Sequence, residues 1–180
     1  TGARHIELPL HSKNPYVMRR NIARLKELIA AEGVDLLHAR SRAPAHSAIA
    51  AARQSNIRFV TTFHATYNFS TPPKRWYNSI MAKGERVIAI SNALKEHITG
   101  NYDVNPGRIK VIHRGIDLER FDPLKVSAER VIQLSRQWRL SDGVPVVLLP
   151  GRLTGWKGQS ILIEALARLG HKQIRCLLVG

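Results

Sequence analysis

The sequence predicts an α/β protein built around a parallel sheet. Six short runs of β-branched and aliphatic residues have strand length, and helical segments separate them along the chain. Most of these runs do not alternate between apolar and polar residues, which is typical of parallel strands buried on both faces. Strands that alternate with helices in this way are expected to be joined by right-handed crossovers.

The apolar runs place the expected strands along the chain. They cover residues 34–38, 58–63, 86–90, 109–112, 145–149 and 174–179. Capping residues and helical spacing place the helices between them: Asn14 offers an N-cap before Pro15, and Gly33 is a natural stop. The expected helical segments, caps included, are 14–33, 45–54, 74–83, 91–98, 127–138 and 158–169. Trp76, Tyr77 and Trp138 are expected to anchor the core.

A domain junction is expected near residue 115. No strand-like run lies between Gly115 and about Val144, and the composition changes there. We therefore expect one domain over residues 1–115 and the start of a second over residues 116–180. The chain begins without a methionine and stops just after an apolar run, so we expect it to be part of a longer protein.

Composition excludes several classes of protein. One cysteine among 180 residues rules out a disulfide scaffold and a multi-cysteine metal site. The apolar runs are all too short to span a membrane, and no signal peptide is visible. The net charge of +15 is spread over both halves of the chain, without a basic tail. This charge is compatible with nucleic acid, acidic lipid or phosphorylated ligands as anionic partners. The alternative is that it only reflects a proteome that is basic in general.

The segment from Gly151 to Gly158 is the most informative part of the chain. It follows an expected strand, precedes an expected helix, and places Arg152 and Lys157 in a glycine-rich turn. A helix N-terminus attracts phosphate, and these two cations suit a diphosphate. The spacing fits neither a Walker A loop nor a dinucleotide fingerprint. An ordinary turn with solvated charges is the alternative.

Polar residues also follow the earlier strands, at the edge where open α/β sheets bind ligands. His64 ends the second strand, where it has either a structural or a functional role. Arg40 and Arg42 lie in an expected loop after the first strand, as solvated charges or as anion contacts. A metal site is not expected, because no His-x-x-x-His or Asp-x-Asp spacing occurs.

Four motifs in order resemble family 4 retaining glycosyltransferases, in particular the bacterial lipopolysaccharide-type branch. The 151–158 segment is similar to that family's Arg-x4-Lys loop for the donor diphosphate. The other motifs are Phe63-His64, the Val87–Ser91 stretch and the segment from Val111 to Pro123, in which His113-Arg114 replaces the usual Pro-Asn. The resemblance implies a GT-B-like fold: a Rossmann-like, acceptor-side first domain, then the start of a Rossmann-like donor domain.

The resemblance also implies a reaction and roles for single residues. A sugar moves with retention from a nucleotide-sugar donor to a lipid-linked or polysaccharide acceptor, and neither a metal nor another cofactor is expected, because cations neutralise the leaving diphosphate. His64 is the expected catalytic residue. The residues implied at the donor diphosphate are Gly151, Arg152, Lys157 and Gly158. Topology places Arg40, Arg42, Tyr67 and Asn68 on the acceptor side.

Further expectations concern the protein's setting. The family's Glu-x7-Glu motif falls after residue 180 and its first glycine-rich loop before residue 1, so we expect this fragment alone to be inactive. We expect a cytoplasmic protein with weak attachment to an anionic inner membrane face, and no nucleic-acid partner. The alternatives are a non-catalytic protein that binds a nucleotide-sugar and, with less support, a basic nucleic-acid-binding module.

Overall fold

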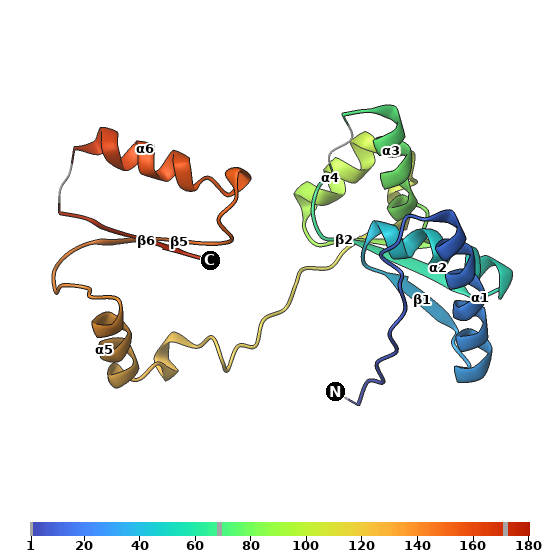
Figure 1. Cartoon of the computed structure of the whole chain (residues 1–180), viewed down its shortest axis with the longest axis horizontal. Coiled ribbons are helices and arrows are strands. Elements are labelled where there is room, and N and C mark those ends of the chain that lie inside the picture. The colour runs from blue at the N-terminus through green and yellow to red at the C-terminus, as the bar shows by residue number, and fades with distance from the viewer. Residues whose placement is uncertain (1, 68–69, 171–172) are drawn as a thin grey trace. The chain divides into compact units, whose positions relative to one another are not determined.

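The computed structural model describes residues 2–67, 70–170 and 173–180 (Figure 1). The chain divides into two compact units, Thr1–Gly115 and Ile116–Gly180. Both units are α/β, and all strand pairs among the described residues are parallel. The predicted fold class is therefore confirmed at the level of secondary structure and strand direction.

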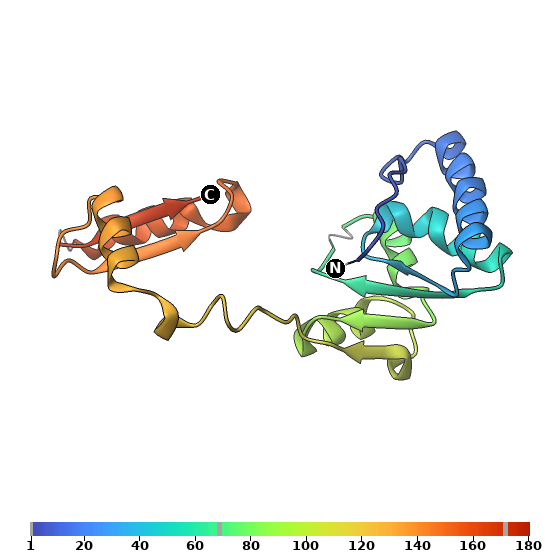
Figure 2. The ribbon, with the colours of Figure 1, turned by 90° about the horizontal axis from the view of Figure 1, so that it is seen from below.

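The first unit contains a four-stranded parallel sheet in which the spatial order follows the sequence (Figure 2). Its strands are β1 (Leu36–Ala39), β2 (Arg58–Phe63), β3 (Arg86–Ala89) and β4 (Ile109–Val111). In the register, Ala39 is opposite Thr61, and Phe63 is opposite Ala89. Because all four strands run the same way, their carboxyl ends share one edge of the sheet.

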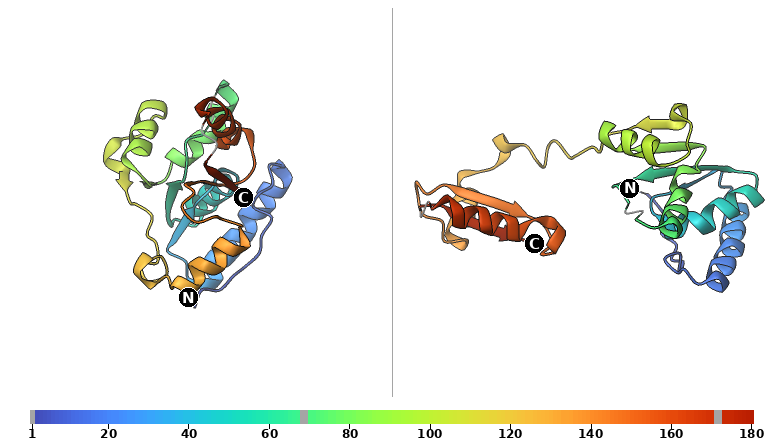
Figure 3. Two further views of the ribbon diagram at one scale, coloured as in Figure 1. Left: turned by 90° about the vertical axis from the view of Figure 1, so that its left-hand side faces the viewer. Right: turned by 90° about the horizontal axis from the view of Figure 1, so that it is seen from above.

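Helices connect these strands and cover the sheet. They are α1 (Pro15–Glu32), α2 (Arg42–Gln54), α3 (Pro72–Ser79) and α4 (Asn92–Asn101), with short 3-10 turns at Ile80–Ala82 and Pro106–Arg108. The α2 helix packs on β1 and β2 and in turn carries α1, whereas α4 packs on β3 and β4 (Figure 3). Phe63, Met81, Val87 and Ile98 are fully buried at the centre.

Local sequence signals explain where the helices begin and end. The Asn14 side chain accepts a hydrogen bond from the Tyr16 N–H at 2.9 Å, and Gly33 ends α1 in the left-handed region at φ 61°. Ser91 caps α4 through the Leu94 N–H at 3.2 Å. These caps satisfy backbone groups that a helix end otherwise leaves unpaired.

Several predicted boundaries are shifted. The α2 helix begins at Arg42 and not at 45, because Pro44 is tolerated in a first helical turn. Likewise α3 begins at Pro72, ahead of residue 74, and β1 spans 36–39 where 34–38 was predicted. Arg42 is therefore a helical residue and not part of a loop.

The prediction that all three aromatic side chains anchor the core is wrong for Trp76. Its side chain is 68% exposed, although it belongs to a helix of the folded unit. Tyr77 and Trp138 are half-buried. The short α3 helix lies at the surface, and the interior beneath it is filled by Asn78, Ile80 and Met81.

The second unit is a βαβ element preceded by a helix. It contains α5 (Ala128–Gln137), the parallel pair β5 (Val146–Pro150) and β6 (Arg175–Val179), and α6 (Gln159–Leu169), with 3-10 turns at Pro123–Lys125 and Gly155–Lys157. Ser127 caps α5 as expected. The large apolar side chains of the second unit are partly or largely exposed, and Ile161 is 70% exposed. The apolar faces of this unit are therefore incompletely covered within the described residues.

Candidate functional site

Three basic side chains converge at the carboxyl edge of the first sheet. Arg40 follows β1, His64 follows β2 and Arg114 follows β4. The Nε of Arg40 donates to Nε2 of His64 at 3.2 Å, and an Arg114 guanidinium nitrogen lies 2.8 Å from Nδ1 of the same ring. The parallel topology thus brings residues that follow three different strands together at one edge of the sheet.

His64 cannot satisfy both arginines at once. A guanidinium only donates, and a neutral imidazole has one accepting nitrogen and one N–H. Burial, then the charges of Arg40 and Arg114, and finally His38 lower the pKa of His64 below its ordinary 6.5. The ring is therefore neutral at pH 7, and one guanidinium N–H at this edge stays available for an anionic or polar ligand.

His38 supports this arrangement from β1. Its Nε2 lies 2.7 Å from the Thr62 hydroxyl on the neighbouring strand. Burial, and secondarily the charge of Arg40, lowers the pKa of His38 as well. The edge therefore carries two neutral imidazoles beside two permanent charges, and neither arginine forms an ion pair with an acidic side chain of the described chain.

Arg42 and Tyr67 lie next to this edge and form a second constellation. The Arg42 guanidinium donates to Oδ1 of the buried Asn78 at 2.8 Å and lies 4.4 Å from the centre of the Tyr67 ring. Burial raises the pKa of the Tyr67 hydroxyl, and the Arg42 charge offsets only part of this increase. Asn68, the fourth residue expected on the acceptor side, lies outside the described residues.

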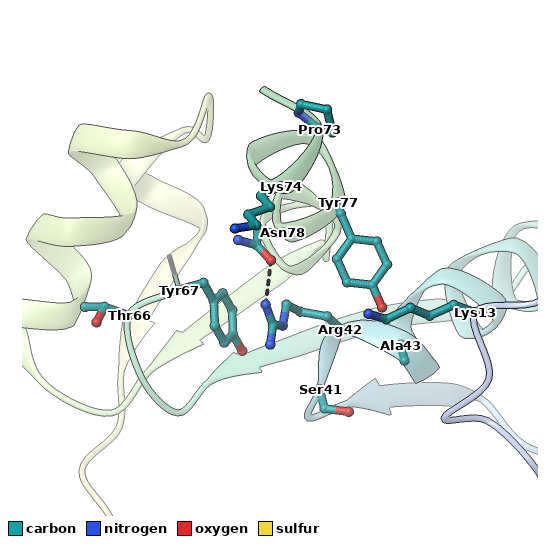
Figure 4. A pocket seen from close by; sticks show the side chains of 10 residues that line it. All are labelled: Lys13, Ser41, Arg42, Ala43, Thr66, Tyr67, Pro73, Lys74, Tyr77 and Asn78. Atoms are coloured by element: carbon teal, nitrogen blue, oxygen red, sulfur yellow. Dashed lines mark hydrogen bonds between the residues drawn. The ribbon is translucent and has the colours of Figure 1, made fainter. Parts of the chain in front are cut away.

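A pocket of about 670 Å³ opens around Arg42 (Figure 4). Its floor comes from the start of α2, one wall from the segment after β2, and the other from α3. The described lining residues include three basic side chains and no acidic one; they are Lys13, Ser41, Arg42, Ala43, Thr66, Tyr67, Pro73, Lys74, Tyr77 and Asn78. Sequence reasoning missed Lys13, Lys74, Tyr77 and Asn78, because only tertiary packing brings these residues beside Arg42.

The predicted donor loop joins β5 to α6 in the second unit. Gly151 has φ 149° and donates its N–H to the carbonyl of Val179 on β6 at 2.6 Å. Gly158, at φ 81°, is the N-cap of α6 and lies in the left-handed region that favours glycine. The aliphatic stem of Lys157 passes near Gly151, where an added Cβ would lie 3.7 Å from its Cδ.

A buried glutamine holds this loop in place. The Gln159 side-chain amide donates to the carbonyls of Gly151 and Arg152, at 3.3 and 3.0 Å, from the first turn of α6. Arg152 and Lys157 are both exposed, and neither forms an ion pair within the described residues. The Lys157 ammonium lies 4.4 Å from the Trp156 ring centre. The loop therefore presents two positive charges at the start of a helix, and Gln159 is a supporting residue that the sequence did not reveal.

Two other kinds of feature are absent from the described residues. They contain no group of three or more His, Cys, Asp or Glu side chains placed to hold a metal ion. Within the same residues, no helix has the length and apolar character needed to cross a membrane.

Comparison with solved structures supports the fold and the resemblance seen in the sequence. A glycosyltransferase from Rickettsia africae ESF-5 is 42% identical, with a TM-score of 0.83 over 98% of this chain and 46% of its own. HepE of Anabaena, solved in complex with UDP-glucose, is 25% identical with a TM-score of 0.72, over 87% of this chain and 42% of its own. These neighbours have the GT-B fold, so the predicted GT-B-like class is confirmed.

Curated proteins give a consistent result. The phosphatidylinositol N-acetylglucosaminyltransferase GPI3 subunit of Saccharomyces cerevisiae is 25% identical over 164 residues, 87% of this chain and 35% of its own length. The D-inositol 3-phosphate glycosyltransferase of Salinispora arenicola is 33% identical over 97 residues, 52% of this chain and 21% of its own length. The chain thus spans about a third or less of these curated relatives.

A family model decides the classification. The model described as Glycosyltransferase Family 4 matches residues 2–120, which is more than half of the chain and includes the edge around His64. The chain therefore belongs to glycosyltransferase family 4.

Proposed function

We propose that the protein containing this chain transfers a sugar from a nucleotide-sugar donor to a glycan or lipid acceptor, with retention of configuration at the transferred carbon. Residues 1–115 supply the acceptor side and residues 116–180 begin the donor side. Membership of family 4 supports a nucleotide-sugar as the donor, and so does the likeness to HepE, which was solved in complex with UDP-glucose.

The loop between β5 and α6 is the observation that carries this proposal. Departure of the sugar leaves negative charge on the diphosphate, and fixed positive groups stabilise that charge most in the transition state. The unpaired cations Arg152 and Lys157, at the N-terminal end of α6, supply such groups without a metal ion. Gly151 and Gly158 leave room for the phosphates to approach the backbone.

His64 is the proposed catalytic residue on the acceptor side. Its lowered pKa keeps the imidazole neutral at pH 7, so that one ring nitrogen accepts a hydrogen bond from an arginine and the other carries an N–H. Arg40, Arg42 and Tyr67 then orient the acceptor. Two curated relatives carry phosphatidylinositol or D-inositol 3-phosphate in their names, which favours an acceptor with a negative charge.

Binding of UDP to the complete protein tests the donor side. Each charge-assisted hydrogen bond contributes about 1.5–3 kcal/mol, so Arg152→Ala and Lys157→Ala should each lower affinity or transfer rate by roughly 10- to 150-fold. The matched control is Lys125→Ala, which removes an exposed lysine elsewhere in the same unit. Affinity is measured by calorimetry, and transfer by release of nucleoside diphosphate from a panel of nucleotide-sugars.

The outcomes separate the possible functions. Loss of UDP binding in both loop variants, with a normal control and measurable release, supports the proposal. UDP binding without release from any sugar identifies a binding protein and contradicts transfer. Normal behaviour of both loop variants makes the segment an ordinary turn and removes the proposal's main support.

A further inference from the structure

The pocket around Arg42 is lined by positively charged side chains and adjoins a second, apolar cavity. Lys13, Arg42 and Lys74 come from three separate segments of the chain, and the described residues that line the pocket include no carboxylate. Three cations gathered without a counter-charge repel one another, so an anion in the pocket would relieve that repulsion. This charge arrangement selects a ligand with concentrated negative charge, above all a phosphate.

Arg42 is held in place for such a ligand. Its guanidinium is anchored on one side by the buried Asn78 and on one face by the Tyr67 ring, which leaves further N–H donors directed into the pocket (Figure 4). A guanidinium matches two phosphate oxygens at once, and an anchored one loses little entropy on binding. On the opposite wall the Lys13 ammonium lies 5.4 Å from the centre of the Tyr77 ring.

A second, apolar cavity adjoins the pocket and shares Lys13, Ala43 and Tyr77 with it. This cavity, of about 320 Å³, lies between the start of α1, α2 and α3; the remaining lining residues are Ser12, Pro15, Met18, His46 and Trp76. The His46 ring stacks on Tyr77 with a centroid distance of 4.7 Å. Trp76, which is 68% exposed, forms part of its rim. We call this cavity the Trp76 groove.

We propose that the pocket binds the phosphate of an amphiphilic acceptor and that the Trp76 groove holds the acceptor's apolar chain. The shared residues make the two cavities adjacent, so one molecule that lies across them can place its charged end on Arg42 and its apolar part against Trp76. The occupant is therefore a phosphate ester that carries an alkyl or similar chain. Its identification as the acceptor rests on the proposed function, because Ser41 and Tyr67 are close in sequence to Arg40 and His64.

Three water-soluble probes separate the contributions of charge and chain: octyl phosphate, ethyl phosphate and octyl glucoside. Each is titrated as a monomer into the complete protein, and binding is followed by calorimetry. Octyl phosphate should bind about tenfold or more tightly than either other probe, since it alone satisfies both the cations and the groove. Equal binding of ethyl and octyl phosphate would identify a soluble phosphate ester and overturn the apolar half. Equal binding of octyl glucoside and octyl phosphate would overturn the phosphate site.

Variants assign the effect to residues. Lys74→Ala removes an exposed charge and should weaken octyl phosphate about tenfold, and Arg42→Ala should weaken it at least as much. Trp76→Ala should weaken octyl phosphate but leave ethyl phosphate unchanged. The control Lys26→Ala removes an exposed lysine of α1 that lines neither cavity. An equal loss for Lys26→Ala and Lys74→Ala would show non-specific attraction and contradict the site.

The same variants separate this proposal from the proposed function. Lys74→Ala and Trp76→Ala should leave UDP affinity unchanged, because the donor loop belongs to the second unit. Absence of nucleoside-diphosphate release from every nucleotide-sugar of the panel, together with specific octyl phosphate binding, would refute the transfer reaction but support the pocket. Normal UDP binding together with no preference for octyl phosphate would refute the pocket alone.

Discussion

At the scale of single residues, the site depends on charges that the described chain leaves uncompensated. Arg40 and Arg114 face one imidazole, Arg152 and Lys157 lie in one loop, and the ion pairs recorded in the described chain involve other side chains. Like charges in close proximity repel one another, and an anion bound between them relieves that repulsion. Arg114 is informative here, because in the sequence it follows the fourth strand and departs from the family's usual Pro-Asn, and the structure places its guanidinium against His64.

The charge on Arg114 should contribute to the low pKa of His64, after burial and the charge of Arg40. A histidine with a lower pKa in the folded state binds fewer protons than in the unfolded chain, so its stabilising effect is complete above the ordinary value near 6.5 and declines as the pH falls. Arg114→Ala should therefore raise the midpoint of the His64 NMR titration and reduce the loss of stability on acidification. Lys26→Ala should change neither. An unchanged midpoint in Arg114→Ala would show that its guanidinium does not act on the ring.

Arginine at position 152 should not be replaceable by lysine. Lysine keeps the charge but lacks the planar fork that contacts two phosphate oxygens. Arg152→Lys should therefore recover part of the transfer rate that Arg152→Ala loses, measured as nucleoside-diphosphate release by the complete protein. Full recovery would show that position 152 contributes only a point charge, and the two-oxygen contact would have to be abandoned.

At the scale of elements, the sequence predicted what depends on local pattern and missed what depends on packing. The six strands, the caps at Asn14, Ser91 and Ser127, and the stop at Gly33 follow from residue type and spacing, and the structure confirms them. Helix starts at tolerated prolines were misplaced, because proline permits a first turn as well as a loop.

The candidate site also combines residues that the local sequence pattern predicted with residues that only tertiary packing brings together. Arg40 and His64 were predictable as neighbours because parallel strands place their carboxyl ends together. The position of the Lys74 side chain could not be predicted from the sequence, because Lys74 reaches the pocket only through the packing of α3 near α2. Trp76 was misjudged since aromatic character predicts burial on average, whereas α3 turns this side chain outward. The roles of Gly151, Arg152, Lys157 and Gly158 stay predictions.

One glycine should prove essential to the junction before β3. Gly84 is buried, and a Cβ there would lie 2.7 Å from the Arg86 carbonyl and 3.0 Å from the Thr61 backbone nitrogen. Because backbone cannot yield cheaply, Gly84→Ala should cost about 1–3 kcal/mol in urea unfolding, in the range of overpacked cores. Gly100→Ala is the control: its Cβ meets nothing within 4 Å, and alanine favours the helix. Equal stabilities for the two variants would contradict the close approach.

At the scale of the whole molecule, the two units differ in how much apolar surface they bury. The first unit has a continuous core that includes Phe63, Met81 and Ile98, whereas Leu148, Ile161 and Ile163 of the second unit are each about half exposed or more. Stability should therefore be concentrated in the first sheet, because burial of apolar surface is the main driving force for folding.

Matched isoleucine truncations test this difference in the 180-residue chain. Ile98 is fully buried, so Ile98→Ala should cost about 2–5 kcal/mol, the range for such truncations in cores. Ile161 is 70% exposed, and Ile161→Ala should stay within about 0.5 kcal/mol of the parent, as for surface positions. Both changes in the free energy of unfolding are measured by chemical denaturation, which is monitored with a probe in the unit that carries the substitution. A large cost at Ile161 would reveal cover over α6 and contradict the uneven distribution.

The net charge of +15 should also direct the molecule as a whole towards anionic surfaces. Each lysine or arginine that reaches an anionic membrane contributes up to ~1 kcal/mol, and only those facing one plane contribute. Co-sedimentation with phosphatidylcholine vesicles should therefore rise when phosphatidylglycerol is added. It should fall again in 1 M salt, where the Debye length is only ~3 Å. The double variant Arg19→Glu with Arg20→Glu, at exposed positions on α1, should reduce it further. Binding that ignores both salt and anionic lipid would mean that the positive charge serves soluble ligands such as phosphate esters and nucleotide-sugars, and not a membrane.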